Sequence, residues 1–225
     1  MSLLIFIGLC FIFFAFPSLR CIALNFPRWL FLTLKDLFFY IRNLAFNICP
    51  SGKIICFSGL FGYGKTLSAV HYISHLYHRY NNKKCFVNGK FRTQKVIILS
   101  NVAFTDIPYK PFECLDQITA FTKQKKELDG DKYYYVLLCL GDEFSTCLNS
   151  RQFKNNIDPI FLNTLVTCRH YAISLYYTSQ RFNLVDKLLR DVTFFTVECR
   201  KHGRIESNIW FDSFDMENCK ERNIS

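Results

Sequence analysis

A short glycine-bearing segment, GLFGYGKT at residues 59–66, restricts the possible folds more than any other part of this chain. It has the spacing GxxxxGK[ST], and the residues around it predict a strand at 53–58 and an amphipathic helix at 65–80. From average glycine usage, the bare spacing arises by chance in on the order of one chain in a hundred of this length. Strand, loop and helix together therefore favour a phosphate-binding loop over an ordinary glycine-rich turn.

The residue types in this segment predict how it would bind a nucleotide. Glycines allow successive backbone N–H groups to point at a phosphate, and the start of the helix adds the positive end of its dipole. We expect Gly59, Gly62 and Gly64 to form this loop, with Gly62 adding flexibility only. Lys65 is expected to reach the β and γ phosphates and Thr66 to ligate Mg²⁺. The predicted ligands are ATP and Mg²⁺.

Two adjacent acids follow the most apolar of the predicted strands, at residues 133–140. At the carboxyl end of a strand next to the loop, Asp142 is expected to hold Mg²⁺ through its water. Glu143 is expected to orient or deprotonate the water that attacks the γ-phosphate. Gln180, after the next apolar run, fits a sensor of that phosphate. An ordinary helix N-terminus remains the alternative for the acid pair, and a strand leaving the sheet remains the alternative for Gln180.

From residue 51 to residue 225 the pattern predicts a single ATPase domain. Short apolar runs alternate with helical stretches, which is typical of an α/β fold with a mainly parallel sheet and helices on both faces. A turn-rich boundary, Cys49-Pro50-Ser51-Gly52, precedes it. We predict strands at 53–58, 95–100, 133–140, 172–178 and 192–199, helices at 65–80, 113–126, 157–169 and 183–190, and a C-terminal β-hairpin completed by residues 204–211.

The N-terminal residues have a different composition, and no charged residue occurs from 1 to 19. This run predicts an uncleaved transmembrane anchor, because the features of a cleaved signal peptide are missing. Basic residues then outnumber acids, which places the remainder in the cytoplasm of a single-pass protein of the host inner or plasma membrane. Residues 20–50 predict a basic amphipathic juxtamembrane helix, with cations at positions 28, 35 and 42. A second transmembrane span and a helix packed on the core remain as alternatives for this segment.

Charge and cysteine content exclude some classes of protein. The chain has 28 Lys and Arg against 18 Asp and Glu, a formal charge of +10, which favours acidic partners such as nucleic acid or anionic lipid. Half of the residues are hydrophobic, which excludes a disordered chain. The 11 cysteines form no CxxC pair, so neither a disulfide framework nor a zinc site is expected.

The order of the motifs resembles a known family. GLFGYGKT, VIILSNV, LLCLGDEF and CRHYAISLYYTSQRFNLVDKLLRD together are similar to the FtsK/HerA-type P-loop ATPases, particularly the zonular-occludens-toxin-like proteins of filamentous phage assembly. The resemblance covers about residues 53–212. Its later positions are matched by Arg169, His170, Gln180, Asp186 and Arg190. The family usually places its transmembrane helix after the ATPase domain, whereas here the apolar run comes first.

This resemblance implies a membrane-associated ATP-hydrolysing motor that extrudes viral DNA, as a single strand, during virion assembly. The implied partners are that DNA, the membrane, virion or secretion-complex proteins, and further copies of the chain in a ring. In such a ring Arg169, or else Arg151 or Arg190, would reach the neighbour's nucleotide. Basic stretches at 83–84, at 123–126 and near Arg200 either line a DNA channel or are solvated loops.

Two other functions remain open from the sequence. A genome-packaging or conjugative DNA-translocating ATPase would use the same residues for another transport step. A nucleotide-gated membrane scaffold without catalysis would bind ATP but not turn it over.

Overall fold

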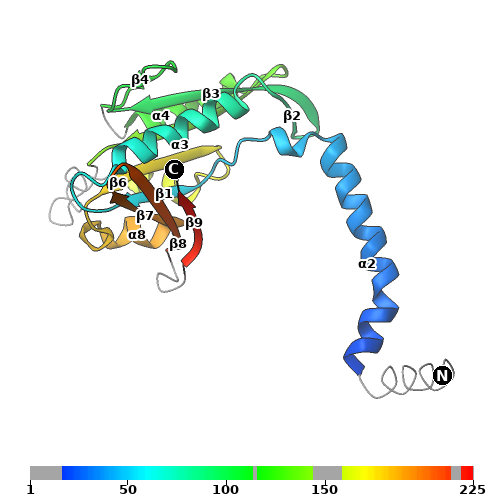
Figure 1. Ribbon diagram of the computed structural model, residues 1–225. Coiled ribbons are helices and arrows are strands. Elements are labelled where there is room, and N and C mark those ends of the chain that lie inside the picture. The colour runs from blue at the N-terminus through cyan, green and yellow to red at the C-terminus, as the bar shows by residue number, and fades with distance from the viewer. Residues whose placement is uncertain (1–16, 114–115, 144–158, 214–218, 225) are drawn as a thin grey trace, which may run out of the picture. The chain divides into compact units, whose positions relative to one another are not determined.

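The computed structural model describes residues 17–113, 116–143, 159–213 and 219–224. The chain divides into two compact units, Met1–Phe46 and Asn47–Ser225. The first unit contains the helix α2, and the second contains the sheet and its covering helices (Figure 1).

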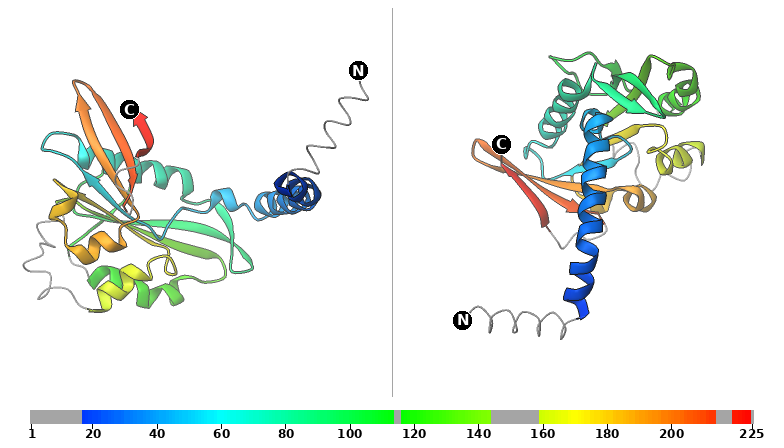
Figure 2. Two further views of the ribbon diagram at one scale, coloured as in Figure 1. Left: turned by 90° about the horizontal axis from the view of Figure 1, so that it is seen from below. Right: turned by 90° about the vertical axis from the view of Figure 1, so that its right-hand side faces the viewer.

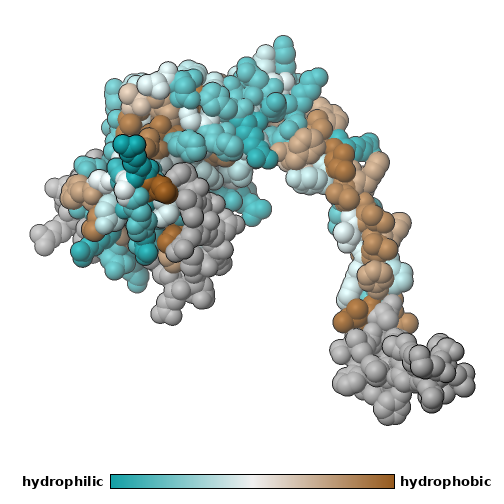
Figure 3. Space-filling view, viewed as in Figure 1, coloured by the Kyte–Doolittle hydropathy of each residue, from teal (hydrophilic) through white to brown (hydrophobic). Residues whose placement is uncertain are grey.

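Helix α2, Pro17–Arg42, is one continuous helix of 26 residues. Pro17 stands at its start, where a missing N–H removes no helical hydrogen bond, and Pro27 lies inside it. Large apolar side chains along it are exposed, Trp29 and Phe38 among them, and Figure 3 shows hydrophobic residues gathered along this helix. The sequence had predicted a boundary at residue 20, within what is a single helix.

The prediction of a single-pass membrane protein is wrong. Within residues 17–113, 116–143, 159–213 and 219–224, no helix combines the length and the apolarity that crossing a bilayer requires. In α2 the reason is that charged residues recur along the helix and interrupt every long apolar stretch: Arg20, Arg28, Lys35, Asp36 and Arg42. Residues 1–16 of the anchor predicted at 1–19 lie outside the described residues.

The second unit is built on a nine-stranded mixed sheet, counted over the described residues, with the order β2-β3-β5-β6-β1-β7-β8-β9 and β4 paired to β3. The strands are β1 Ile54–Ser58, β2 Lys84–Val87, β3 Lys90–Ser100, β4 Lys110–Pro111, β5 Tyr133–Gly141, β6 Ile173–Ser179, β7 Phe195–His202, β8 Ile205–Asp212 and β9 Cys219–Ile224.

Five neighbouring strands, β3, β5, β6, β1 and β7, run parallel. Their carboxyl ends therefore meet at one edge of the sheet. All five residues of β1 are buried, because it pairs with a strand on each side and both of its faces are covered. The remaining long pairs, β2 with β3, β7 with β8 and β8 with β9, are antiparallel.

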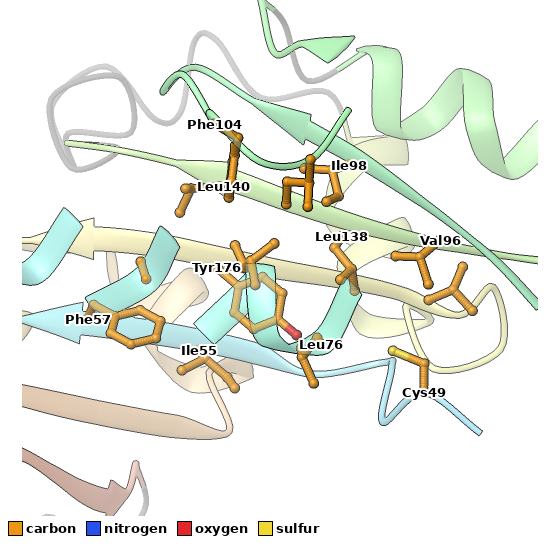
Figure 4. Packing of buried hydrophobic residues seen from close by; sticks show 14 of the residues in the cluster. Cys49, Ile55, Phe57, Leu76, Val96, Ile98, Phe104, Leu138, Leu140 and Tyr176 are labelled. Atoms are coloured by element: carbon orange, nitrogen blue, oxygen red, sulfur yellow. The ribbon is translucent and has the colours of Figure 1, made fainter. Parts of the chain in front are cut away.

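Helices cover both faces of the sheet, as predicted (Figure 2). On one face α3, Lys65–Tyr80, packs Ile73 and Leu76 against a cluster that includes Ile55 and Phe57 of β1 (Figure 4). On the other face lie α4 (Asp116–Leu128), α7 (Pro159–Val166) and α8 (Lys187–Val192). Short 3-10 helices occupy Ala45–Asn47 and Phe182–Leu184.

Three strands were not predicted: β2, β4 and β9. The turn between β2 and β3 consists of Asn88 and Gly89, which both have positive φ angles, 53° and 78°. This is the usual two-residue turn of a β-hairpin, and the Asn-Gly pair in the sequence was an available signal for it. The predicted hairpin is present as β7 and β8, and β9 adds a further antiparallel strand to it.

Candidate functional site

The predicted phosphate loop connects the buried end of β1 to the first turn of α3. Gly59 lies so close to β7 that a Cβ atom there would be 2.7 Å from the carbonyl oxygen of Cys199. Gly64 is the N-cap of α3 with a φ of 78°, a backbone conformation that favours glycine. Gly62 lies in the middle of the loop. The fold therefore requires glycine at positions 59 and 64, where a side chain would clash or strain the backbone.

Lys65 and Thr66 are the first two residues of α3. The Lys65 ammonium turns back over the loop: Nζ donates a hydrogen bond to the Leu60 carbonyl at 3.1 Å and lies 5.6 Å from the centre of the Phe61 ring. A positive side chain and a helix N-terminus therefore lie together. Such an arrangement attracts a phosphate group.

Asp142 lies in direct contact with this loop. The Thr66 hydroxyl donates to Asp142 Oδ1 at 2.8 Å, and the Thr178 hydroxyl donates to the same oxygen at 2.7 Å. The sequence suggests that Asp142 follows the strand directly beside the loop. The sheet order instead puts β6 between β1 and β5, the strand that Asp142 follows. Its carboxylate meets Thr66 across the end of β6, the strand that supplies Thr178.

Glu143 follows Asp142 in an unusual backbone conformation. Its φ is 50°, which costs a residue with a side chain on the order of 1 kcal/mol. Its N–H donates to the Thr178 hydroxyl at 2.7 Å, and its side chain is exposed at the carboxyl edge. The second acid therefore stands beside the first, on the side open to solvent.

The oxygen atoms of Asp142 and Thr66 fit a magnesium ion. Mg²⁺ prefers carboxylate and hydroxyl oxygens and keeps several water or phosphate ligands. The two residues are already hydrogen-bonded to each other, and the Lys65 ammonium is bonded to the loop carbonyl of Leu60. Either residue could reach a cation without a change of fold.

Gln180 lies one residue beyond β6 and lines a cavity of about 520 Å³ next to the loop. Three segments of the chain form the wall of this cavity: the end of β1 with the loop, the residues after β6, and the β7–β8 hairpin. Its aromatic and basic members are Tyr63, Phe182, Phe211, Arg181, Arg200, Lys201 and His202. Sequence reasoning missed the cavity, because only the parallel pairing of β7 with β1 brings the hairpin beside the loop.

Arg169 lies at the opposite end of the sheet. Its backbone packs on Gly52, where a Cβ atom would be 2.5 Å from the Arg169 Cα, just before β1 begins. It is therefore separated from the phosphate loop of its own chain by the length of β1. Its role toward a neighbouring copy stays a prediction, and Arg151 lies outside the described residues.

Two other residues matched by the resemblance, Asp186 and Arg190, lie at α8. Asp186 caps α8, its carboxylate accepting from the Leu188 N–H at 2.8 Å. In the described part of the chain, the buried Arg190 Nε has no hydrogen-bond partner. Lys125, in one of the predicted basic stretches, is not available to a channel: its side chain is 7% exposed and pairs with Asp129 at 3.0 Å.

One residue beside the acid pair was not assigned a role from the sequence. Asn101, directly after β3, donates from Nδ2 to the Asp142 carbonyl at 3.1 Å and accepts from the Asp142 N–H at 2.8 Å. The available signal was its position, a polar residue at the carboxyl end of a strand, but the sequence does not say that β3 and β5 are neighbours.

No protein-family model matches the chain, and no curated protein sequence matches it. Similar solved structures include the N-terminal domain of zonular occludens toxin from Neisseria meningitidis, with 16% identity and a TM-score of 0.48 over 78% of this chain and 94% of that one. They also include B204, the DNA-packaging ATPase from Sulfolobus Turreted Icosahedral Virus, with 10% identity and a TM-score of 0.47 over 77% of this chain and 97% of that one.

ATPases 2 and 3 of EssC from Geobacillus thermodenitrificans are similar over 65% of this chain and 32% of that one, with 11% identity and a TM-score of 0.42. All three structures are no more than 16% identical to this chain, so the resemblance to FtsK/HerA-type ATPases rests on the motifs of the sequence. With TM-scores below 0.5, these similarities do not bear on what this chain binds or does.

Proposed function

We propose that this protein is a Mg²⁺-dependent ATP hydrolase that drives the movement of viral or phage DNA. One observation carries the proposal. The Thr66 hydroxyl and the Asp142 carboxylate are hydrogen-bonded at the start of a helix, beside a glycine loop that also holds the Lys65 ammonium. A phosphate cradle and oxygen ligands for a cation thus lie together, as hydrolysis of a nucleoside triphosphate requires.

Each residue has a defined task in this proposal. The loop N–H groups and Lys65 bind the β and γ phosphates and neutralise their charge. Thr66 and Asp142 would hold Mg²⁺, which polarises the phosphoryl group. Glu143 orients or deprotonates the attacking water, a role that its exposed position beside Asp142 supports. Gln180 hydrogen-bonds the γ-phosphate, and the cavity that it lines offers the nucleoside aromatic and polar contacts.

DNA as the moved polymer is supported by charge. At the tip of the β7–β8 hairpin, Lys201 and His202 at the end of β7 and Arg204 in the turn are exposed, and this hairpin projects from the body of the second unit (Figure 2). Cations there would contact phosphates of a nucleic acid. The resemblance of the motifs favours extrusion of a single-stranded genome by a ring of copies. Packaging into a capsid or conjugative transfer would use the same site.

We further propose that α2 lies along the surface of an anionic membrane without crossing it. Arg28, Lys35 and Arg42 are seven residues apart and so share one side of a helix whose apolar side chains are exposed. Trp29 reports on this directly: in a Trp210→Phe background its emission should shift to shorter wavelength on anionic vesicles and not on zwitterionic ones. An unchanged Trp29 spectrum on both would rule the proposal out.

Hydrolysis is tested on the full chain. ATP turnover is measured with and without Mg²⁺ and single-stranded DNA, in the wild type and in Glu143→Gln. We expect DNA-stimulated turnover that Glu143→Gln lowers by about 10²–10⁴-fold, the usual contribution of a general base, with ATP binding retained. Glu127→Gln, an exposed change on α4, is the matched control. Equal, negligible turnover in all three proteins would instead support a nucleotide-gated scaffold.

A further inference from the structure

The ladder of backbone hydrogen bonds ends just before the two acids. The pairing of β5 with β3 ends at Leu140, and its pairing with β6 ends at Gly141. Asp142 and Glu143 therefore lie beyond the regular sheet. Their orientation must be determined by other contacts.

On the β3 side, that contact is Asn101. Its side-chain amide makes two hydrogen bonds to the main chain of Asp142, donating to the carbonyl at 3.1 Å and accepting from the N–H at 2.8 Å. Its own N–H also points to the Leu140 carbonyl at 3.4 Å. The side chain thus continues the pairing of the two strands by one residue and fixes the Asp142 peptide groups.

On the β6 side, the contact is the hydroxyl of Thr178, a residue with no exposed surface. It donates to Asp142 Oδ1 at 2.7 Å and accepts from the Glu143 N–H at 2.7 Å. One hydroxyl therefore orients the first carboxylate and also ties down the backbone of the second acid. Because Glu143 has a φ of 50°, this hydrogen bond offsets part of the strain.

We propose that Asn101 and Thr178 are the positioning residues of the acid pair, and that they hold Asp142 toward Thr66 and keep Glu143 in its strained conformation beside it. The inference rests on the proposed function, since it assigns these two side chains to the same site. Neither residue is expected to touch the nucleotide. Each acts through the orientation of Asp142 and Glu143.

The test compares isosteric and conservative variants of the full chain. Thr178→Val keeps the shape and removes the hydroxyl, whereas Thr178→Ser keeps the hydroxyl. Asn101→Ala removes both hydrogen bonds, whereas Asn101→Asp keeps only the acceptor. Thr122→Val is the matched control, because the Thr122 hydroxyl bonds within α4 to the Thr119 carbonyl. Melting temperatures establish that each variant is folded.

Three quantities are measured: the Mg²⁺ concentration for half-maximal binding of a fluorescent, non-hydrolysable ATP analogue, and both kcat and KM for ATP. We expect Thr178→Val and Asn101→Ala to raise the Mg²⁺ requirement and to lower kcat by about 10–100-fold, the usual effect of losing a side chain that orients a metal ligand. Analogue binding without Mg²⁺ should be unchanged. Thr178→Ser should restore most of the loss, and Asn101→Asp should lie between wild type and Asn101→Ala.

Wild-type Mg²⁺ dependence and kcat in folded Thr178→Val and Asn101→Ala would overturn the proposal. If Thr178→Val does not fold, the comparison of Asn101→Ala with Asn101→Asp tests the proposal, because Asn101 is exposed. If the wild type hydrolyses no ATP, the proposed function fails, and the Mg²⁺ dependence of analogue binding still decides whether these residues position Asp142.

Discussion

The two ends of the parallel strands use polar side chains in opposite ways. At the carboxyl edge, the hydroxyls of Thr66 on α3 and Thr178 on β6 both donate to the carboxylate of Asp142, which follows β5. At the amino end, polar side chains bond mainly to the backbone. Gln94 accepts from the Cys49 N–H at 3.0 Å and donates to the Tyr80 carbonyl at 2.9 Å, with no exposed surface.

Lys125 is the extreme case at the amino end. Its ammonium donates to the Tyr135 carbonyl and pairs with Asp129, whose carboxylate accepts from the Tyr135 N–H at 2.8 Å. Burial lowers the pKa of Lys125, with the Asp129 carboxylate acting against that shift. At the amino end, polar groups thus bond to other groups of the protein and stabilise the fold. At the carboxyl edge, oxygen atoms remain that a ligand can reach. A buried charge such as that of Lys125 indicates a role in stability, whereas side chains that converge on one point indicate a role in binding.

Replacement of Lys125 should give the largest loss of stability. Lys125→Ala leaves the nearly buried Asp129 carboxylate without its cation, and we expect a loss of about 3–5 kcal/mol in the free energy of unfolding, measured by urea denaturation. Lys123→Ala, an exposed change on the same helix, should cost less than about 0.5 kcal/mol. Equal losses of unfolding free energy in the two variants would contradict the stabilising role given to polar groups at the amino end of the sheet.

Replacement of Thr66 should have a small effect on stability and a large effect on binding. Thr66→Val removes one partly exposed hydrogen bond, so we expect a loss of no more than about 1 kcal/mol in the free energy of unfolding. The Mg²⁺-dependent part of ATP binding should weaken by at least about tenfold, measured by titration calorimetry with and without the ion. A stability loss close to that of Lys125→Ala would make Thr66 a structural residue.

Much of the parallel core could be predicted from the sequence, since its strands are apolar runs and its helices are amphipathic. Residues 65–80 were predicted as a helix, and α3 has those bounds. The contact of Asp142 with Thr66 agrees with the spacing and context of the phosphate loop, although the catalytic roles remain predictions.

What could not be predicted depends on strand order. Nothing local to Asn101 indicates that β3 lies beside β5, and nothing local to the hairpin indicates that β7 pairs with β1. Lys125 looked like one of several surface cations, because its burial depends on Tyr135 and Asp129 folding back over it. The anchor predicted at 1–19 lies almost entirely outside the described residues, and charges recur in α2, the helix that follows it.

The central strands also have a chemical consequence. Cys56 on β1 and Cys139 on β5 are free thiols with no exposed surface, and burial raises the pKa of both well above the ordinary value for cysteine. An alkylating reagent can modify them only after these strands separate. The extent of their modification over time, read by mass spectrometry, would therefore count opening events of the very strands that carry the phosphate loop and the acid pair.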